Sequence, residues 1–431
     1  MENQLKSGLS STAIERKTFY LHIVSQVFNG FAIGILLLQD VILKKTLGGS
    51  DFDVLMLSFF LCTAFLASIY GTEIVNRSSN PSRTIIILGF TAKFFLIILP
   101  LFKNPVFYIF CLSVTAYFDS MLLSSWNIVF KHNYSDKNRS KYFSYVTTIS
   151  VLVTLITLTL FGYVMDIDNN LYNYFFPIAG IFGMLTYYNL SKMIRYSLVN
   201  FPREVFKTVN TYSLKLLKDT LVLPWRLTKK ILTENKPFFR FESYFFMYGV
   251  AFMVISPAIP IYLVDHLQLN YTPISFAKGM VFHSALIMFT PLMGKYHGSG
   301  NPTKFCGYIF LILALYPSLL LLAKYSAFLN LFLEKKILVY SAHFIFGLGM
   351  SGVSISWALS SIYFAPKFEE SNYQAIHITL TGVRGSFSPF LGYFIMKVFG
   401  IEYTFILSAI LFIIGGLLML KESLRKTVQK Q

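Results

Sequence analysis

Five polar residues recur along one stretch near the carboxyl end of the chain, and their types suit the binding of an anion. Gln374, His377, Thr381, Arg384 and Ser388 follow one another at spacings of three, four, three and four positions, which places all five on one helix face. A guanidinium in an apolar environment binds a carboxylate or phosphate through two parallel hydrogen bonds. The pattern predicts a solute site at Arg384; the alternatives are an ion pair with an acid on a neighbouring helix and, for His377, a packing role.

A second ionisable residue, Asp119, lies within the apolar stretch VTAYFDSMLLSSWN, one to two helical turns before Trp126 and Asn127. A carboxylate in a medium of low dielectric constant takes up a proton readily and can carry it across a membrane. Asp119 is therefore a candidate proton carrier. The alternatives are that the Asp119 carboxylate forms an ion pair with Arg384 or contacts a cation.

Polar residues of an earlier apolar stretch can also contact a solute or close a gate. Gln26 and Asn29 share one helix face and can hydrogen-bond a solute, although residues of this type also join neighbouring helices. Asp40 lies nearer the end of the same stretch and is a gate candidate.

Trp126 and Trp357 follow serines at matching places in an internal repeat. Their rings can stack on a ligand or lie at the membrane interface. Lys93, Glu242 and Lys278 also fall in or beside apolar stretches, and no spacing assigns them a role.

These residues are set in a chain suited to lipid. Hydrophobic residues make up 55% of its 431 residues and charged residues 13%, which is more apolar surface than a water-soluble domain can bury. A membrane-crossing helix needs about 20 mostly apolar residues and satisfies its own backbone hydrogen bonds. Twelve such stretches are predicted, at residues 20–43, 53–75, 84–102, 105–130, 143–165, 172–194, 241–265, 273–294, 304–326, 336–362, 373–398 and 402–420.

Composition and motifs argue against several classes of function. The net charge of +17 comes from residues between apolar runs, which favours membrane lipids and not nucleic acid as the partner. Cys62, Cys111 and Cys306 lie in apolar stretches without metal-ligand spacing, so we expect neither a metal nor another cofactor. No glycine-rich phosphate loop is present, and no loop carries an acid, base or metal cluster, so we expect no enzyme.

Basic residues are distributed unevenly between the two sides of the membrane. Of the Lys and Arg residues, 27 fall on the side of the amino terminus and 7 on the other, which predicts cytoplasmic termini. Eleven of the 27 lie in Lys192–Arg240, against three acids. We expect residues 195–240 to form a basic cytoplasmic linker with amphipathic helices on the membrane surface; a solvated connector is the alternative.

The two halves of the chain repeat one another. Four matches occur in chain order at offsets of 219 to 231 positions: Gly30 with Gly249, Asn80-Pro81-Ser82-Arg83 with Asn301-Pro302-Thr303-Lys304, Ser125-Trp126 with Ser356-Trp357, and Gly162-Tyr163 with Gly392-Tyr393. Parallel repeats of this kind imply a two-fold axis along the membrane normal and a binding site between the halves.

Twelve stretches in two sets of six, with a basic central loop, resemble the major facilitator superfamily. So does the loop after the second stretch, with Gly71, Arg77 and Arg83, which is echoed before Lys304. The resemblance implies an all-α membrane fold of two pseudo-symmetric six-helix bundles, residues 1–194 and 241–431. In that family such loops clasp the cytoplasmic gate, which makes Arg77, Arg83 and Lys304 gate candidates; they also suit a role as membrane anchors.

The sequence therefore predicts a secondary active transporter that moves a small polar or anionic organic solute by alternating access, with protons as the coupling ion. A lipid, lysolipid or drug transporter of the same architecture, and a transporter-like sensor or assembly factor without flux, are the alternatives. Abundant Phe, Tyr, Ile, Lys and Asn suggest an AT-rich genome and a bacterial inner membrane.

Overall fold

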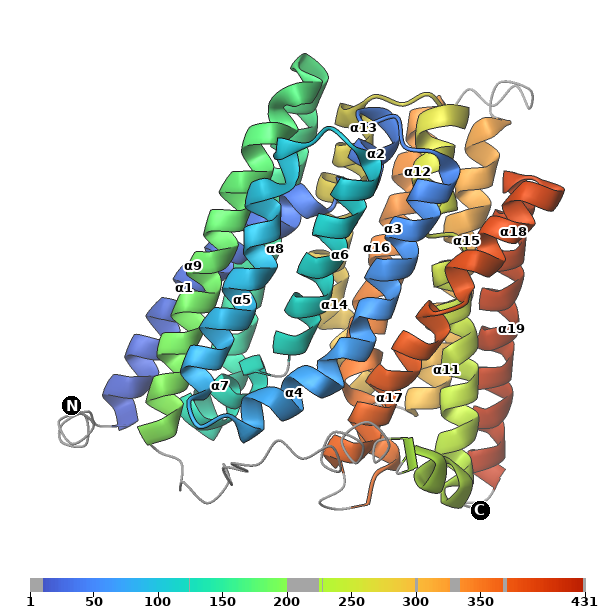
Figure 1. The fold of residues 1–431 in the computed structure, drawn as a ribbon. Coiled ribbons are helices and arrows are strands. Elements are labelled where there is room, and N and C mark those ends of the chain that lie inside the picture. The colour runs from blue at the N-terminus through green and yellow to red at the C-terminus, as the bar shows by residue number, and fades with distance from the viewer. Residues whose placement is uncertain are drawn as a thin grey trace. The chain divides into compact units, whose positions relative to one another are not determined.

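The computed structural model describes residues 11–123, 125–199, 225–226, 228–298, 301–325, 334–366 and 370–428, which are almost entirely helical (Figure 1). The helices of the first half are α1 (Ser11–Leu36), α2 (Gln39–Lys45), α3 (Asp51–Thr63), α4 (Ala67–Arg77), α5 (Pro81–Ile98), α6 (Pro105–Leu122), α7 (Ser125–Asn133), α8 (Asp136–Ile167) and α9 (Tyr172–Val199). Those of the second half are α11 (Lys236–Val254), α12 (Ala258–Ile261), α13 (Tyr271–Phe276), α14 (Phe282–Gly298), α15 (Pro302–Lys324), α16 (Lys335–Leu359), α17 (Glu370–Gly385), α18 (Ser388–Phe399) and α19 (Ile401–Val428).

Helices cover the predicted membrane stretches, but not all are long and apolar enough to cross a membrane unbroken. Within the described ranges, nine helical segments meet that condition. The three predicted stretches outside these nine are 53–75, 172–194 and 373–398. The first is divided by a 3₁₀ turn between α3 and α4. The stretch 373–398 is divided between α17 and α18, where Pro389 has no backbone N–H to donate to a helical hydrogen bond. The stretch 172–194 lies within α9, whose Tyr and Asn residues lower its hydropathy.

The chain forms two compact units, each described here by itself. Unit 1 comprises the described residues within Met1–Leu37, Ala64–Phe161 and Asp168–Val222. Unit 2 comprises those within Leu38–Thr63, Gly162–Ile167 and Leu223–Gln431. Within unit 1, α9 packs along α1 and α5, and within unit 2, α15 packs along α16 and α19 (Figure 1). Unit 2 therefore includes α2, α3 and the end of α8, all from the first half of the sequence.

The repeated Asn-Pro motifs begin helices. The Asn80 side chain accepts the Arg83 N–H at the start of α5, and the Asn301 side chain accepts the Thr303 N–H at the start of α15. In each case the proline takes the first helical position, where a missing N–H costs nothing. This part of the sequence repeat is thus a repeated helix start.

An aromatic core in unit 2 fixes the face of α11 that meets α17. Phe241, Phe245 and Tyr248 recur at helical spacing on α11, are buried, and pack with Phe310 and Phe412 from α15 and α19. Burying rings of this size is strongly favourable. Since these rings fix the rotation of α11, the polar and small residues between them are directed at its neighbours, including α17.

Candidate functional site

Arg384 near the end of α17 is almost completely buried, with 4% of its surface exposed. Its Nη1 donates to the carbonyl of Phe245 at 3.0 Å, and its Nη2 donates to the Thr381 hydroxyl at 3.1 Å. Its Nε, also buried, has no hydrogen-bond partner among the described residues. A buried charged donor without an acceptor is costly, and no described residue supplies one to this Nε.

Small residues and rings make room for this guanidinium. A Cβ atom at Gly249 of α11 would overlap the Arg384 guanidinium, so the guanidinium occupies the space that a side chain at position 249 would need. The Phe245 and Tyr248 rings have their centres 5.9 and 5.8 Å from the Arg384 Cζ atom, within cation–π range. On the other side, Gly385 brings α17 against α3, since a Cβ at that position would lie 2.6 Å from the Cys62 carbonyl oxygen.

A buried acid, Glu242 of α11, contacts His377 on the same helix as Arg384. The Glu242 carboxylate lies 3.0 Å from Nδ1 of His377, and both residues are buried. The Thr381 hydroxyl donates to the His377 carbonyl and accepts from Arg384. The His377 Nε2 is buried without a partner among the described residues. The α17 face thus carries the Arg384 guanidinium and the imidazole of a buried carboxylate–imidazole pair, whose carboxylate comes from α11.

The remaining members of the α17 face make structural contacts. The Gln374 amide donates to the carbonyl of Trp357 and accepts from the Ser361 hydroxyl. The Trp357 ring meets His377 edge to face at a centroid distance of 5.9 Å. These contacts hold α17 against the end of α16 and fix the orientation of His377.

In unit 1, Asp119 has its own partners. Its carboxylate accepts from Lys93 of α5 at 2.6 Å and from the Tyr187 hydroxyl of α9 at 2.7 Å. A Cβ at Gly89 would overlap the Tyr187 ring, and a Cβ at Gly183 would lie 2.6 Å from the Lys93 side chain. Two glycines therefore make space for this pair. Lys93, and not Arg384, is the cation that the structure gives Asp119.

The other unit 1 candidates lie among packed side chains. Gln26 and Asn29 are half-buried and approach each other at 3.5 Å. The Trp126 ring stacks on the buried His22 ring at a centroid distance of 5.2 Å and packs against an apolar cluster. The side chain of Asn127 is outside the described part of the structure. Trp126 is therefore held by protein contacts, as Trp357 is.

The gate candidates differ in what they contact. Both Asp40 carboxylate oxygens accept from Lys278 at 2.9 Å within unit 2. Arg83 and Lys304 are exposed near the starts of α5 and α15. The side chain of Arg77 is outside the described part of the structure. Among the described side chains of this group, Asp40 is held in an ion pair.

Unit 2 also contains an ionic network that joins segments from both halves of the sequence. Lys44 of α2 contacts Asp51 and Asp265, each at 2.8 Å, and Lys397 of α18 contacts Asp51 at 2.7 Å. The Asp166 carboxylate, at the end of α8, accepts the N–H groups of two residues in the first turn of α13. Segments that are distant in the chain are thus tied together by charge.

Sequence reasoning did not assign roles to Glu242, Lys93 and Lys278, which the structure places beside His377, Asp119 and Asp40. All three are ionisable residues in or next to apolar stretches, the one signal that marked them. Gly89 and Gly183, which make space for Tyr187 and Lys93, are a second signal. It can be recognised only when it is known which helices are neighbours. Among the described residues, no group of three His, Cys, Asp or Glu side chains is placed to hold a metal ion.

Comparison with known proteins agrees with this architecture. The sequence model of the Major Facilitator Superfamily matches residues 23–383, whereas the chain matches none of the curated proteins with which it was compared. It is similar in structure to a POT family transporter solved with 5-aminolevulinic acid, at a TM-score of 0.68 and 16% identity over 94% of this chain and 96% of that one.

Two further solved structures have the same fold. The nucleoside transporter NupG gives a TM-score of 0.63 at 10% identity, over 95% of this chain and 99% of that one. The human organic anion transporter MFSD10 gives 0.61 at 10% identity, over 94% and 99%. At such identities the likeness shows the fold alone. The family match covers most of the chain and agrees with its membrane-crossing helices, so the chain belongs to the Major Facilitator Superfamily of membrane transporters.

Proposed function

We propose that this protein is a secondary active transporter that carries a small organic anion by alternating access, with Arg384 as its anion-binding residue. The observation that carries the proposal is the buried Arg384 guanidinium, whose Nε lacks an acceptor among the described residues. A carboxylate or phosphate supplies two acceptor oxygens in the geometry that a guanidinium prefers. The neighbours solved with 5-aminolevulinic acid or described as an organic anion transporter are in keeping with such a solute.

Protons are the proposed coupling ion, and the Glu242–His377 pair is the proposed coupling group. Thr381 bridges Arg384 and the backbone carbonyl of His377, and the His377 imidazole contacts Glu242. A change in the protonation of this pair therefore alters the field at a nearby guanidinium. Asp119 has Lys93 beside it and is proposed as a pathway residue of unit 1.

The proposal places the chain in the membrane as twelve helices in two six-helix bundles, residues 1–194 and 241–431, with both termini cytoplasmic. Helices at all twelve predicted stretches and the charge bias of the loops support it. A bacterial inner membrane is the proposed location. The linker at 195–240 lies largely outside the described residues; within it, residues 228–234 are helical.

The solute proposal is tested by thermal unfolding of the full chain in detergent against organic acids, peptides, amino acids, nucleosides and sugars. A ligand raises the unfolding temperature of the state that it binds. We expect an acidic solute to stabilise the wild type and the Arg226→Gln variant, which loses an exposed arginine, but not Arg384→Gln. An acidic solute that stabilises all three equally would contradict the role of Arg384.

The coupling proposal is tested in proteoliposomes with the solute so identified. For Glu242→Gln we expect uptake driven by a pH gradient to be lost while exchange of labelled for unlabelled solute continues, because exchange requires no net proton movement. Glu234→Gln, which removes an exposed acid in the same region, should keep both activities. Gradient-driven uptake by Glu242→Gln at the wild-type rate would refute this assignment.

A further inference from the structure

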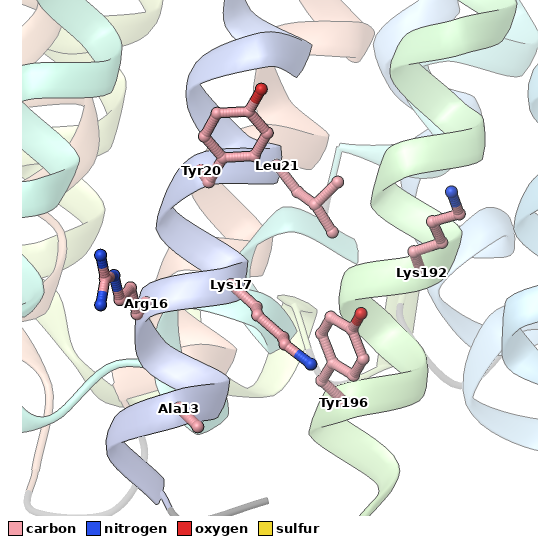
Figure 2. Close-up of a pocket in the computed structure, with 7 residues that line it drawn as sticks. All are labelled: Ala13, Arg16, Lys17, Tyr20, Leu21, Lys192 and Tyr196. Carbon is pink, nitrogen blue, oxygen red and sulfur yellow. The ribbon is translucent and has the colours of Figure 1, made fainter.

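A basic pocket lies between α1 and α9 in unit 1 (Figure 2). It has a volume of about 660 Å³, and its polar lining consists of Arg16, Lys17 and Tyr20 from α1 with Lys192 and Tyr196 from α9. In Figure 2 the Lys17 side chain reaches across from α1 towards the Tyr196 ring of α9. The pocket is thus built by two helices that pack along each other.

Helical spacing directs these residues to one place. Arg16 and Lys17 precede Tyr20 by four and three positions on α1, and Lys192 precedes Tyr196 by four on α9. Residues three or four positions apart share a helix face. Two adjoining faces therefore supply the lining of a single volume, into which Lys17 extends towards α9, while the Arg16 guanidinium lies on the side of α1 away from α9 (Figure 2).

The three cations, Arg16, Lys17 and Lys192, form no ion pair with an acid among the described residues. Lys192 instead lies over the Tyr188 ring, 4.2 Å from its centre. Glu15, the acid adjacent to Arg16, accepts hydrogen bonds from Ser135 and Asn138 at the start of α8 and is thereby engaged elsewhere. Three like charges around one pocket repel one another, and an anion in the pocket removes that repulsion.

An exposed apolar strip continues from the pocket along α9. Ile181, Leu185 and Tyr188 precede Lys192 at spacings of four, three and four, and 49%, 38% and 41% of their respective surfaces are exposed. The site therefore has a cationic end with hydroxyl donors and an apolar extension on the same helix face. This is the shape of a molecule with an anionic headgroup and a hydrocarbon chain, and a free phosphate would leave the strip uncovered.

We propose that the α1–α9 pocket binds the phosphate of an anionic phospholipid, with an acyl chain lying along Ile181, Leu185 and Tyr188. The ends of α1 and α9 that carry the pocket are those that the charge distribution assigns to the cytoplasmic leaflet, whose anionic lipids attract juxtamembrane cations. Lys17 contacts the phosphate, the Tyr196 hydroxyl beside it donates to a phosphate oxygen, and Lys192, over the Tyr188 ring, lies at the junction between headgroup and chain. The inference does not depend on the solute proposed above.

The test is lipid binding by the full chain in a zwitterionic detergent, followed by native mass spectrometry and thermal unfolding. The probes are short-chain phosphatidylglycerol, phosphatidylcholine with the same chains, and inorganic phosphate. The variants are Lys17→Gln/Lys192→Gln and a control of equal charge change, Lys137→Gln/Lys141→Gln, which alters two exposed lysines of α8. Phosphatidylglycerol should bind the wild type and the control more tightly than phosphatidylcholine does.

In the pocket variant we expect affinity for phosphatidylglycerol to fall by on the order of tenfold or more, since each cation near a membrane surface contributes about 1 kcal/mol. Equal loss in both double variants would show a diffuse charge effect and overturn the site. Stabilisation by inorganic phosphate as strong as by phosphatidylglycerol would show a soluble anion instead of a lipid. Acidic-solute binding that depends on Arg384 should survive in the pocket variant, so the two proposals fail separately.

Discussion

The Arg384 guanidinium occupies the space that the missing side chain of Gly249 leaves on α11. The internal repeat gives this relationship a counterpart: the offset of 230 that aligns Gly162 with Gly392 aligns Thr154 with Arg384, and Gly30 corresponds to Gly249. In unit 1 the Thr154 hydroxyl donates to the Gly30 carbonyl at 3.1 Å. The same helix crossing therefore holds a neutral contact in one repeat and a buried cation in the other.

Replacing Gly249 with alanine should displace Arg384. The added methyl group overlaps the guanidinium, and overpacking of this kind costs about 1–3 kcal/mol. We expect a lower unfolding temperature and loss of stabilisation by acidic solutes. Gly415→Ala is the control, because the nearest atom to its Cβ is 3.5 Å away, and it should behave as wild type.

The overlap between Gly249→Ala and Arg384 can also be tested without a ligand, from the unfolding temperature alone. In Gly249→Ala/Arg384→Gln the shorter side chain removes the overlap, so part of the lost unfolding temperature should return. If the fall in unfolding temperature of the double variant equals the sum of the falls in the two single variants, the two residues do not share the space.

The Lys93–Asp119 pair should be more sensitive to the loss of one charge than of both. Asp119→Asn leaves the buried Lys93 ammonium without its counter-ion, which costs on the order of 3–5 kcal/mol, whereas Lys93→Met/Asp119→Asn removes both charges. We expect a large fall in unfolding temperature for the single variant and recovery in the double. Transport by the recovered double variant then decides the function: full activity would make the pair purely structural.

Asp166 should hold the start of α13 in place. Its carboxylate accepts from the Tyr271 N–H, the Thr272 N–H and the Thr272 hydroxyl at 2.8, 2.7 and 2.6 Å, the contacts of a helix cap supplied by a distant segment. Loss of a cap costs about 1 kcal/mol. Asp166→Ala should speed amide hydrogen exchange in α13, and Asp166→Asn, which keeps one acceptor, should do so less. Unchanged exchange in the alanine variant would rule out this role.

Acid should weaken the ionic network around Asp51. Burial would raise the pKa of the Asp51 carboxyl, but hydrogen bonds from Lys397 and Lys44 outweigh it and hold that pKa below its ordinary value. A group with a lowered folded-state pKa stabilises the fold above its unfolded pKa, and this contribution is lost as the pH falls through the folded value. Wild type should therefore lose unfolding temperature as the pH falls below the ordinary aspartate pKa of 3.8.

In Asp51→Asn that acid-dependent loss should be smaller, because the titrating group is absent. Asp53→Asn is the matched control: Asp53 accepts from the N–H and hydroxyl of Ser50, and its replacement should leave the acid-dependent loss in place. Identical pH profiles for wild type and Asp51→Asn would contradict the prediction.

The sequence by itself determined the helices, the membrane setting, the repeat and the polar face of α17. These follow from local properties: apolar runs of sufficient length become helices in lipid, and spacings of three and four place Gln374, His377, Thr381 and Arg384 on one face. The family resemblance rested on the same large-scale pattern and was confirmed by the family match.

Only the tertiary structure decided which charges meet. Glu242 and His377, Lys93 and Asp119, and Lys278 and Asp40 are 135, 26 and 238 positions apart in the chain, and no local rule pairs residues at such distances. Their pairing depends on which helices are neighbours and how each is rotated. Those rotations are set by glycine contacts and aromatic packing, as at Gly249 and Phe245, where close packing admits one arrangement and excludes the rest.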